Sequence, residues 1–533
     1  MGPLGKCSTG EYRKQPSLSN SDSTARPWWR GAVFYQVYPR SFADSTGNGV
    51  GDLPGITARL PYIAELGVDA VWVSPFFKSP MYDNGYDVSD YCEVDPCFGT
   101  LADFDALVTA AHDLGLRVMI DWVPAHTSTE HRWFQRALQD PLSEERDYYV
   151  FRDPAPEGGP PNNWRATFDS SAPAWTLDPA SGQYYLHSFL KEQADLNWHN
   201  PNLRAAMHDT LRFWLDRGVD GFRMDVVHNI GKDPALADRP EAVARLPHML
   251  FNDDPSTHGY LREIRALLAS YPGDRTSVGE VFLLDTDKVA TYYGHDDELH
   301  MCFNFPPLLA QWNAEAWRSC IESTYNAFES RDAWPTWVLS NHDQKRHRTR
   351  YEGSELRARA AAVLLLTLRG SPFVYQGEEL GLLDAEVPED RIVDPAGRDG
   401  CRAPIPWTDQ APWGWTVRPW LPFPPECAER NVATQQRKPS GILSLYKRLL
   451  TLRRNHSALS SGTFDLLDSP DDTIAYERRD GTQVITVVVN FGDRVVELPS
   501  LLQGTVLCSS AQRAAGPCRT LAPSEAVVLQ VSE

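Results

Sequence analysis

The stretch Gly221-Phe222-Arg223-Met224-Asp225-Val226-Val227 is a short apolar run that carries two charged residues set two apart. Residues two apart on a β-strand face the same side, so Arg223 and Asp225 point together into whatever this strand lines. Burying opposite charges in an apolar strand is costly, and their attraction offsets the cost only in part. The stretch alone fits either a structural ion pair or a carboxylate that a cation keeps ionised as a nucleophile.

Around this stretch, short apolar runs alternate with longer runs of helical period. The apolar runs predict eight strands: Ala32–Pro39, Ala70–Phe76, Arg117–Val123, Gly221–Val227, Ser277–Phe282, His300–Phe305, Thr336–Ser340 and Pro372–Gln376. The longer runs predict helices at Ile56–Leu66, Leu101–Leu114, Asn202–Arg217, Tyr260–Ser270, Glu355–Leu368 and Ile442–Arg454. Strands that alternate with helices are typical of parallel βα units, and eight of them match a closed α/β (β/α)8 TIM barrel. No glycine-rich dinucleotide turn follows the first strand, which disfavours an open doubly wound sheet.

Two connections in this pattern are too long for simple loops, and loops of such length usually carry function. One follows the third strand and is rich in Trp, Pro and Gly; the other, 378–439, follows the eighth strand. Beyond the last helix, alternating strands are expected at Thr473–Glu477, Gln483–Asn490, Val495–Leu498 and Ala526–Val531. The expected division is a disordered N-terminal extension (1–24), a catalytic barrel (25–123 and 201–459), an inserted subdomain (124–200) and a C-terminal antiparallel β-sandwich domain (460–533).

The composition excludes several classes of partner. The net charge of −20 argues against nucleic acid or an anionic membrane surface. No apolar stretch approaches the length of a membrane span, and the first residues lack the apolar segment of a secretory signal. The nine cysteines are scattered without metal-ligand spacing, which is typical of reduced core residues. We expect a cytoplasmic monomer or homodimer.

Acidic residues stand at the ends of several predicted strands. They lie in the segments Asp121–His126, Arg223–Asp225, Gly279–Glu280 and Ser340–Asp343. Barrel enzymes keep their chemistry at the carboxyl ends of the strands. Several carboxylates and two histidines, His126 and His342, that converge on one barrel mouth are hard to explain as packing. We expect the two histidines to be neutral donors to substrate hydroxyls.

Retaining glycoside hydrolysis needs such a set of acids. One carboxylate attacks the anomeric carbon, and the other protonates the leaving oxygen and later deprotonates water. Asp225 is predicted to be the nucleophile, kept ionised by Arg223. Glu280 is predicted to be the acid/base, because a pocket beside an ionised carboxylate raises its pKa. Asp343 is expected to bind sugar hydroxyls and to stabilise the cation-like transition state.

As an ordered set, these segments resemble the α-amylase family of glycoside hydrolases (family 13), in its α-glucosidase and oligo-1,6-glucosidase branch. The matching blocks are Gly31–Arg40, Asp121–His126, Gly221–Asp225, Gly279–Val281, Ser340–Asp343 and Gly370–Gly377. The block Gln193-Ala194-Asp195-Leu196-Asn197 resembles that branch's QPDLN signature, with Ala194 in place of proline. The likeness runs from about Trp28 to the C-terminus.

The resemblance implies further substrate contacts. Asp83 and Tyr86, after the second strand, would bind the non-reducing glucose, beside Arg223. Arg402 would pair with Asp83 and close the end of the pocket, which implies exo-action. Phe189 would flank the next sugar.

One loop has the spacing of a calcium site. The oxygen groups of Asp44, Thr46, Asn48 and Asp52 fall at positions 1, 3, 5 and 9 of a calcium loop, with the carbonyl of Val50 at position 7. The alternative is a glycine-rich turn held by side-chain-to-backbone hydrogen bonds. The resemblance implies one structural Ca²⁺ or Mg²⁺ here, and no organic cofactor is expected.

The sequence therefore predicts an exo-acting, retaining α-glucosidase that acts on short α-glucosides through a covalent glucosyl-enzyme intermediate. In relatives, valine directly after the nucleophile accompanies α-1,6 preference, so Val226 favours that linkage without deciding against α-1,4. A transglucosylase or isomerase, in which a sugar hydroxyl replaces water, would use the same catalytic residues. A non-catalytic transporter subunit of this family is disfavoured, since the catalytic acids are retained and no anchor is seen.

Overall fold

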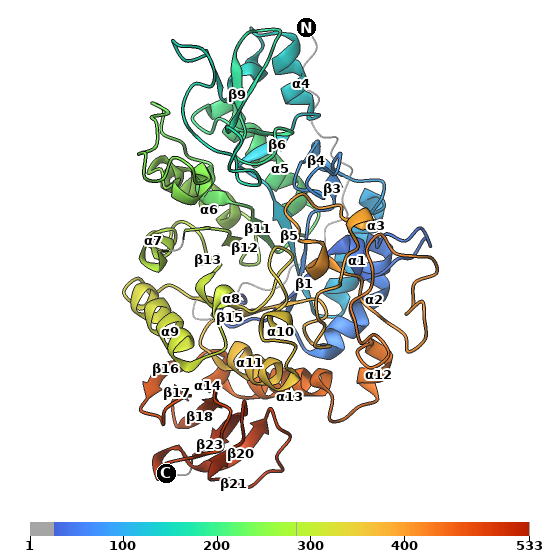
Figure 1. Cartoon of the computed structure of the whole chain (residues 1–533), viewed down its shortest axis with the longest axis vertical. Helices are drawn as coiled ribbons and strands as arrows, with labels where there is room; N and C mark the ends of the chain where they lie inside the picture. Colours follow the sequence, from blue (N-terminus) through green and yellow to red (C-terminus); the bar gives the residue numbers. More distant parts are fainter. Residues whose placement is uncertain (1–25, 284, 532–533) are drawn as a thin grey trace.

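The computed structural model describes residues 26–283 and 285–531, so the predicted N-terminal extension lies outside the described residues. Eight parallel strands form a central barrel (Figure 1). They are β1 (Phe34–Val37), β2 (Ala70–Val73), β5 (Arg117–Trp122), β11 (Gly221–Met224), β12 (Thr276–Gly279), β13 (Met301–Cys302), β14 (Thr336–Val338) and β15 (Ser371–Tyr375). The predicted barrel is confirmed, with all eight strands in the expected places.

The strands pair in the order β13-β12-β11-β5-β2-β1-β15-β14, so the ladder leaves one seam between β13 and β14. A side chain crosses this seam. The Thr336 hydroxyl donates to the Cys302 carbonyl at 2.8 Å and accepts from the Asn304 N–H at 3.2 Å. The barrel is therefore nearly closed by backbone pairing and is completed by a buried hydroxyl.

Helices cover the outside of the barrel. The longer ones are α2 (Leu53–Leu66), α3 (Leu101–Asp113), α5 (Pro201–Leu215), α6 (Ser256–Ala269), α9 (Ala314–Glu329), α11 (Glu355–Thr367) and α13 (Ile442–Asn455). The short helices of the chain are α1 (Pro39–Phe42), α4 (Arg132–Gln139), α7 (Thr286–Thr291), α8 (Pro306–Leu309), α10 (His347–Arg350), α12 (Val432–Gln436) and α14 (Ser457–Ser460). Of these, α4 lies at the upper end of the molecule, away from the barrel, and α14 packs on the C-terminal strands (Figure 1). Polar side chains cap several N-termini, as Asp52 does for α2 and Asn200 for α5. All six predicted helices are present. In the described part, no helix has both the length and the apolar character that a membrane crossing needs.

The chain after β5 leaves the barrel and forms small sheets at the upper end of the molecule (Figure 1). They comprise the pair β6 (His126–Ser128) and β10 (Gln193–Asp195), and the sheet of β7 (Phe151–Arg152), β8 (Trp175–Leu177) and β9 (Tyr184–Leu186). A two-stranded ribbon, β3 (Phe77–Lys78) and β4 (Asp90–Val94), precedes them. In the antiparallel β6–β10 pair, Asp195 lies opposite His126. This pairing brings the predicted QPDLN-like block back to the barrel mouth.

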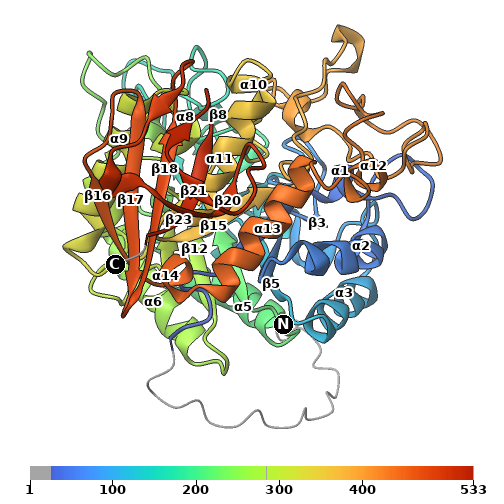
Figure 2. The ribbon, with the colours of Figure 1, turned by 90° about the horizontal axis from the view of Figure 1, so that it is seen from below.

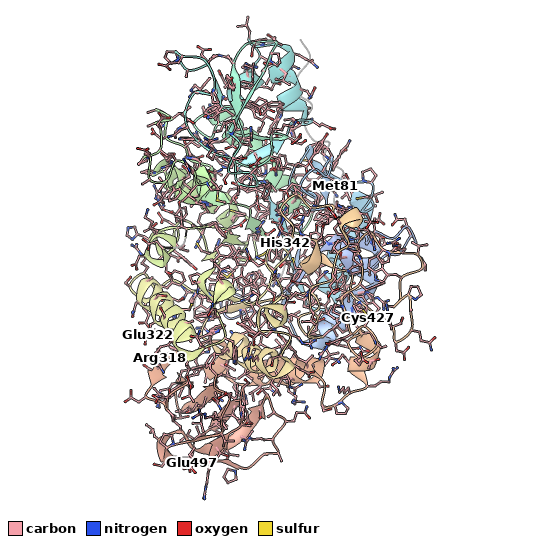
Figure 3. All side chains as sticks on the ribbon, in the orientation of Figure 1. Met81, Arg318, Glu322, His342, Cys427 and Glu497 are labelled. Carbon is pink, nitrogen blue, oxygen red and sulfur yellow. The ribbon has the colours of Figure 1, made fainter. Side chains whose placement is uncertain are left out.

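The C-terminal residues form a six-stranded antiparallel sheet in the order β16-β17-β18-β23-β20-β21. Its strands are β16 (Thr463–Leu467), β17 (Thr473–Asp480), β18 (Gln483–Asn490), β20 (Gly504–Ser509), β21 (Pro517–Cys518) and β23 (Ala526–Gln530). One face packs on α11 and α13, and α13 lies between this sheet and α2 (Figure 2). The ribbon β19–β22 (Val496–Glu497 and Thr520–Leu521) contributes Leu498 and Leu521 to the core on the other face, where a second sandwich layer was expected. This ribbon, marked by Glu497, lies far from His342 at the barrel mouth (Figure 3).

Candidate active site

One guanidinium joins the carboxyl ends of three neighbouring barrel strands. Arg223, on β11, places Nη1 2.5 Å from Asp121 Oδ1 and 2.7 Å from Asp225 Oδ1, and places Nη2 2.6 Å from Glu280 Oε2. Arg223 is level with Asp121 on the adjacent strand β5, and β12 lies on its other side. A side chain from the middle strand therefore reaches both neighbours. The charges of Asp121 and Asp225 compensate a cation that is only 2% exposed, and the Glu280 carboxyl group adds a hydrogen bond.

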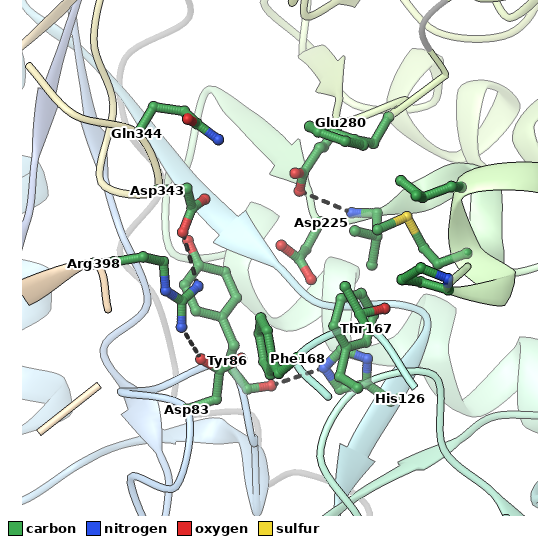
Figure 4. A pocket seen from close by; sticks show the side chains of 16 residues that line it. Asp83, Tyr86, His126, Thr167, Phe168, Asp225, Glu280, Asp343, Gln344 and Arg398 are labelled. Atoms are coloured by element: carbon green, nitrogen blue, oxygen red, sulfur yellow. Dashed lines mark hydrogen bonds and ion pairs between the residues drawn. The ribbon is translucent and has the colours of Figure 1, made fainter. Parts of the chain in front are cut away.

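Asp225 and Glu280 lie next to each other in the wall of a pocket (Figure 4). The Val226 N–H, directly after Asp225, donates to Glu280 Oε2 at 3.2 Å. Val226 has φ +34° in the left-handed region, which is strained for a β-branched residue. Such strain clusters at functional sites. The turn after β11 therefore places the Asp225 carboxylate in the pocket wall and directs the Val226 N–H to Glu280.

The two acids differ in proton affinity. Burial raises the pKa of Asp225 to about 6, and the Arg223 cation counteracts the rise. Burial raises the pKa of Glu280 to about 8. The Arg223 cation lowers this pKa, and the negative charge of Asp225 raises it further. Asp225 therefore ionises first, and Glu280 keeps its proton near neutral pH. This order is the one that a nucleophile and a general acid need.

We expect kcat/KM to follow a bell-shaped pH profile. Activity should fall as the pH drops below about 6, because Asp225 becomes protonated there. It should also fall as the pH rises above about 8, because Glu280 then loses the proton that it must donate. Initial rates between about pH 4 and pH 10 test both limbs. Rates that keep rising below about pH 5, or that stay flat beyond about pH 9, would contradict these protonation states.

A second group of charges closes one end of the pocket. Arg398 places Nη2 2.6 Å from Asp83 Oδ1 and Nη1 2.9 Å from Asp343 Oδ1, and it also pairs with Asp394 at 2.6 Å. Burial raises the pKa of Asp343, but the neighbouring charges, including Arg398 and Arg402, outweigh burial and hold this pKa well below its usual range. Asp343 is therefore ionised. In Figure 4, Asp83, Arg398 and Asp343 lie together on the side away from Glu280.

The predicted pair of Arg402 with Asp83 is wrong. Arg402 is fully buried, donates from Nε to the His342 carbonyl at 2.8 Å, and reaches Asp343 and Asp394 from behind the pocket. Residues 399–402 form a single 3₁₀ turn, which carries Arg402 beneath the pocket floor and leaves Arg398 at its edge. Arg398, four residues earlier in the same motif, makes the closing pair.

Replacing Arg398 with alanine should lower kcat/KM for maltose by roughly 30-fold or more. Losing one partner of a buried charge pair costs about 2–5 kcal/mol; Asp83 loses its arginine partner, whereas Asp343 keeps Arg402 at 3.1 Å. Arg398→Lys should recover part of the loss, because lysine keeps the positive charge but has no second nitrogen to bind Asp83 and Asp343 at once. Arg391→Ala is the matched control on the same loop, since its guanidinium bonds backbone carbonyls near Trp420. Equal KM and kcat in Arg398→Ala and Arg391→Ala would contradict the assignment.

His342 supports the pocket floor from beneath. The Gln36 amide donates to its Nδ1 at 2.8 Å, so its Nε2–H donates to the Tyr86 hydroxyl at 2.6 Å. Burial lowers the pKa of His342 to about 3, and the ring is neutral. The Tyr86 ring stacks on the imidazole at 5.4 Å. His342 therefore fixes Tyr86, whose ring lines the pocket.

His126 lies beside Asp83 in the pocket wall. Its Nε2 donates to the Tyr86 carbonyl at 3.1 Å, and burial lowers its pKa. Its Nδ1 is buried and meets no hydrogen-bond partner in 26–283 or 285–531. Gln193 donates to Asp83 Oδ2 at 3.0 Å and orients that carboxylate. The sequence signal for Gln193 was its place at the head of the QPDLN-like block.

The pocket has a volume of about 340 Å³. Seven predicted residues line it: Asp83, Tyr86, His126, Phe189, Asp225, Glu280 and Asp343. Three others, Arg223, His342 and Arg402, lie behind the wall and hold the lining residues. Val226, which the sequence analysis used as an indicator of linkage, also lines the pocket. Sequence reasoning did not predict the remaining lining residues: Thr167, Phe168, Pro247, Met249, Leu250, Phe282, Gln344 and Arg398. Most of these come from long loops that carry no local signal; the arginine-rich motif could have identified Arg398.

The loop of residues 44–52 winds around the Asp44 carboxylate. Asp44 Oδ1 accepts from the Gly47 N–H at 2.7 Å, and Oδ2 accepts from the Gly49 N–H at 2.8 Å. Asn48 Oδ1 accepts from the Val50 N–H, and Asp52 caps α2. The turn hydrogen bonds of the alternative interpretation are thus present. Each carboxylate still has lone pairs to offer, and the all-oxygen donor set with Thr46 suits a hard cation.

Comparisons with known proteins agree with this geometry. Residues 36–462 match the family model described as Alpha amylase, catalytic domain. A probable alpha-glucosidase of Rhizobium meliloti (strain 1021) is 40% identical over 514 residues, covering 89% of this chain and 91% of the relative. An oligo-1,6-glucosidase of Parageobacillus thermoglucosidasius is 37% identical over 525 residues, covering 89% of this chain and 92% of the relative. A solved structure of the alpha-glucosyl transfer enzyme XgtA superposes with a TM-score of 0.88 at 41% identity, covering 95% of this chain and all of that one.

Proposed function

The chain belongs to the alpha-amylase family of glycoside hydrolases, and we propose that it is an exo-acting, retaining α-glucosidase that releases terminal α-linked glucose from short α-glucosides. The observation that carries the proposal is the Arg223 guanidinium, which holds Asp225 and Glu280 side by side at the mouth of the barrel. The two nitrogens of this one guanidinium lie 2.7 Å from Asp225 Oδ1 and 2.6 Å from Glu280 Oε2, so the two carboxyl groups are close together. A close carboxylate pair leaves no room for the water that an inverting enzyme places between its acids.

The reaction follows from the proton states of the two acids. Asp225 attacks the anomeric carbon of the bound glucose while Glu280 gives its proton to the leaving glycosidic oxygen. The result is a β-linked glucosyl ester on Asp225 and a free alcohol. Glu280, now a carboxylate, then takes a proton from water. The water oxygen attacks the same carbon, the ester bond breaks, and α-glucose leaves with its configuration retained.

The closed end of the pocket accounts for exo-action. The Asp83–Arg398–Asp343 group offers charged acceptors and donors to the hydroxyls of one terminal glucose, and it blocks the path of a longer chain. The ionised Asp343 also faces the positive charge that develops on the sugar ring in the transition state. One glucose is therefore removed at a time from the non-reducing end.

Turnover of maltose, isomaltose, sucrose and starch, measured side by side, tests this function. Proton NMR at early times should show α-glucose as the first product. The values of kcat/KM should be far higher for the short substrates than for starch. Starch as the best substrate would show that the pocket end is open. β-Glucose as the first product would show inversion. Because Val226 follows the nucleophile, we propose that isomaltose is preferred to maltose within this panel.

A glucosyl transferase is the second candidate function, favoured by the likeness to the alpha-glucosyl transfer enzyme XgtA. In that case a second alcohol replaces water in the second step, and the same two acids act. The products formed at high concentrations of sucrose or maltose distinguish the two functions. New disaccharides and trisaccharides that dominate over free glucose would favour transfer.

We also propose one structural Ca²⁺ or Mg²⁺ ion in the 44–52 loop, held by Asp44, Thr46, Asn48, Asp52 and the Val50 carbonyl. Protein stripped with a chelator and dialysed should gain a few degrees in Tm when Ca²⁺ or Mg²⁺ is added, because an ion that binds only the folded state stabilises it. Asp44→Asn should reduce the gain. An unchanged Tm with either ion would contradict the site.

We propose that the enzyme works in the cytoplasm. Cys302, Cys401, Cys427, Cys508 and Cys518 are buried thiols without disulfide bonds. Such thiols are typical of proteins from reducing compartments.

A further inference from the structure

One turn of the chain supplies two of the residues that line the closed end of the pocket. Asp83 and Tyr86 stand at the two ends of this turn, and both line the pocket (Figure 4). The Tyr86 N–H donates to the Asp83 carbonyl at 3.1 Å. Between them, the buried Asn84 has φ +51°, a left-handed conformation that asparagine tolerates. A group that fixes the Asn84 side chain therefore fixes both lining residues.

The Arg40 guanidinium is the group that fixes Asn84. Arg40 lies in α1, shortly after β1, and its Nη1 donates to Asn84 Oδ1 at 2.8 Å. A hydrogen bond from a cation is about twice as strong as one between neutral groups. Arg40 is not among the described residues that line the pocket, so it acts on a bound sugar through Asn84.

The Trp420 ring supports Arg40. The Cζ atom of Arg40 lies 4.2 Å from the centre of this ring, within the range of a cation–π contact, which is strongest with tryptophan. The Nε of Arg40 is buried without a hydrogen-bond partner in the described part of the chain, so the ring face and the Asn84 bond hold the guanidinium. An arginine without this support would move among several rotamers and would hold Asn84 less well.

Trp420 is itself tied to the chain that follows β1. Its backbone N–H donates to the Gly49 carbonyl at 2.9 Å, and its Nε1 donates to Ser41 Oγ at 2.9 Å. These two bonds keep Trp420 in place when Arg391 is replaced. The long connection after β15 thus reaches the glucose end of the pocket by a second route, besides the pair that Arg398 makes.

A second arginine–tryptophan pair separates a structural role from a positioning role. The Cζ atom of Arg59, on α2, lies 4.3 Å from the centre of the Trp407 ring, and this ring packs edge-on against Tyr62 of the same helix. Both arginines are half-buried and lie on a tryptophan from the connection after β15. The Arg40 pair differs by its bond to Asn84.

We propose that Arg40 is a positioning residue for the terminal glucose: seated on Trp420, it holds the turn that presents Asp83 and Tyr86 to the sugar. This inference rests on the proposed α-glucosidase activity. The two lining residues meet the glucose before the reaction as well as in the transition state, so poorer alignment weakens the binding of both states. KM should therefore rise while kcat changes little. A contact that only stabilises the fold would lower Tm and leave both constants unchanged.

Arg40→Met, which keeps an unbranched side chain and removes the guanidinium, should raise KM for isomaltose at least about fivefold and change kcat by less than about threefold. The Ki of glucose as a competitive inhibitor should rise by a similar factor, because glucose alone fills this end of the pocket. Arg40→Lys should recover part of both losses, since lysine keeps the charge. Trp420→Leu should also raise KM, and adding it to Arg40→Met should have little further effect, because both changes break one support.

Arg59→Met is the matched control, because it removes a guanidinium from a tryptophan face at nearly the same distance. Its KM, kcat and glucose Ki should equal those of the unaltered enzyme, whatever the change in Tm. All constants are measured well below the Tm of each variant. Unchanged KM and Ki in Arg40→Met, or effects of Arg40→Met and Trp420→Leu that add in full, would overturn the inference and leave the α-glucosidase intact. If the unaltered enzyme turns over no α-glucoside, the proposed function fails, and this inference fails with it.

Discussion

Asp225→Asn should lower kcat by about 10⁴-fold or more on every substrate, because the amide cannot form the glucosyl ester. The fold should tolerate the change. Arg223 keeps the charged Asp121 at 2.5 Å and the Glu280 carboxyl group at 2.6 Å as hydrogen-bond partners, and the isosteric amide fills the same space. Steady-state rates with isomaltose and with 4-nitrophenyl α-glucoside measure the loss, and circular dichroism with a melting curve checks the fold.

Rescue by a small anion tests directly whether Asp225 is the nucleophile. In Asp225→Gly, azide can enter the space of the missing carboxylate and attack the activated 4-nitrophenyl substrate from that side. The product should be β-glucosyl azide, because a single displacement inverts the configuration. Asp225→Asn activity within tenfold of the unaltered enzyme, or α-glucosyl azide from the glycine variant, would show that another group is the nucleophile.

Glu280→Gln should lower kcat/KM for isomaltose by about 10²–10⁴-fold, because the leaving sugar then departs without a proton. The loss in kcat/KM should be much smaller for 4-nitrophenyl α-glucoside, whose leaving group needs no proton. The second step still lacks its base, so this substrate should give a burst of nitrophenolate followed by slow turnover. The basic limb of the pH profile should disappear with the Glu280 carboxyl.

Azide separates the roles of the two acids. In Glu280→Ala, azide needs no base and attacks the ester on Asp225, so the product should be α-glucosyl azide, the opposite anomer to that from Asp225→Gly. Equal losses for both substrates in Glu280→Gln, with no burst, would contradict the acid/base role. Glu263→Gln is a suitable control, because Glu263 pairs with Arg204 on the outer helices and should leave both rates unchanged.

The barrel was predictable because the spacing of apolar residues differs between its strands and its helices over long stretches of the sequence. The segments β16 and β20 escaped prediction for a physical reason. β16 is exposed or half-buried along its whole length, and β20 pairs irregularly with β23 at Val506–Cys508. Neither presents the clean alternation of buried and exposed side chains on which a sequence pattern depends. Pairing with β17 holds β16 in the sheet, and pairing with β23 holds β20.

The catalytic acids were predictable because each directly follows a strand, and the topology of a barrel brings such ends together. Arg398 and Arg402 show the limit of this reasoning. Both stand four residues apart in one polar motif, and the sequence does not reveal which of them the 3₁₀ turn brings to Asp83. Phe168 and Leu250 reach the pocket from long loops, so their positions depend on tertiary packing far from their neighbours in sequence.

Four carboxyl groups line the pocket, Asp83, Asp225, Glu280 and Asp343, and Arg398 is the one cation among the described lining residues. The carboxylates that stabilise the positive charge developing on the glucose ring in the transition state should also bind a permanent cation. A small polyhydroxylated amine, such as the common buffer tris(hydroxymethyl)aminomethane, carries hydroxyls for the charged end and an ammonium for the acids. We therefore expect such an amine to compete with the substrate, so that KM measured in an amine buffer exceeds KM measured in phosphate.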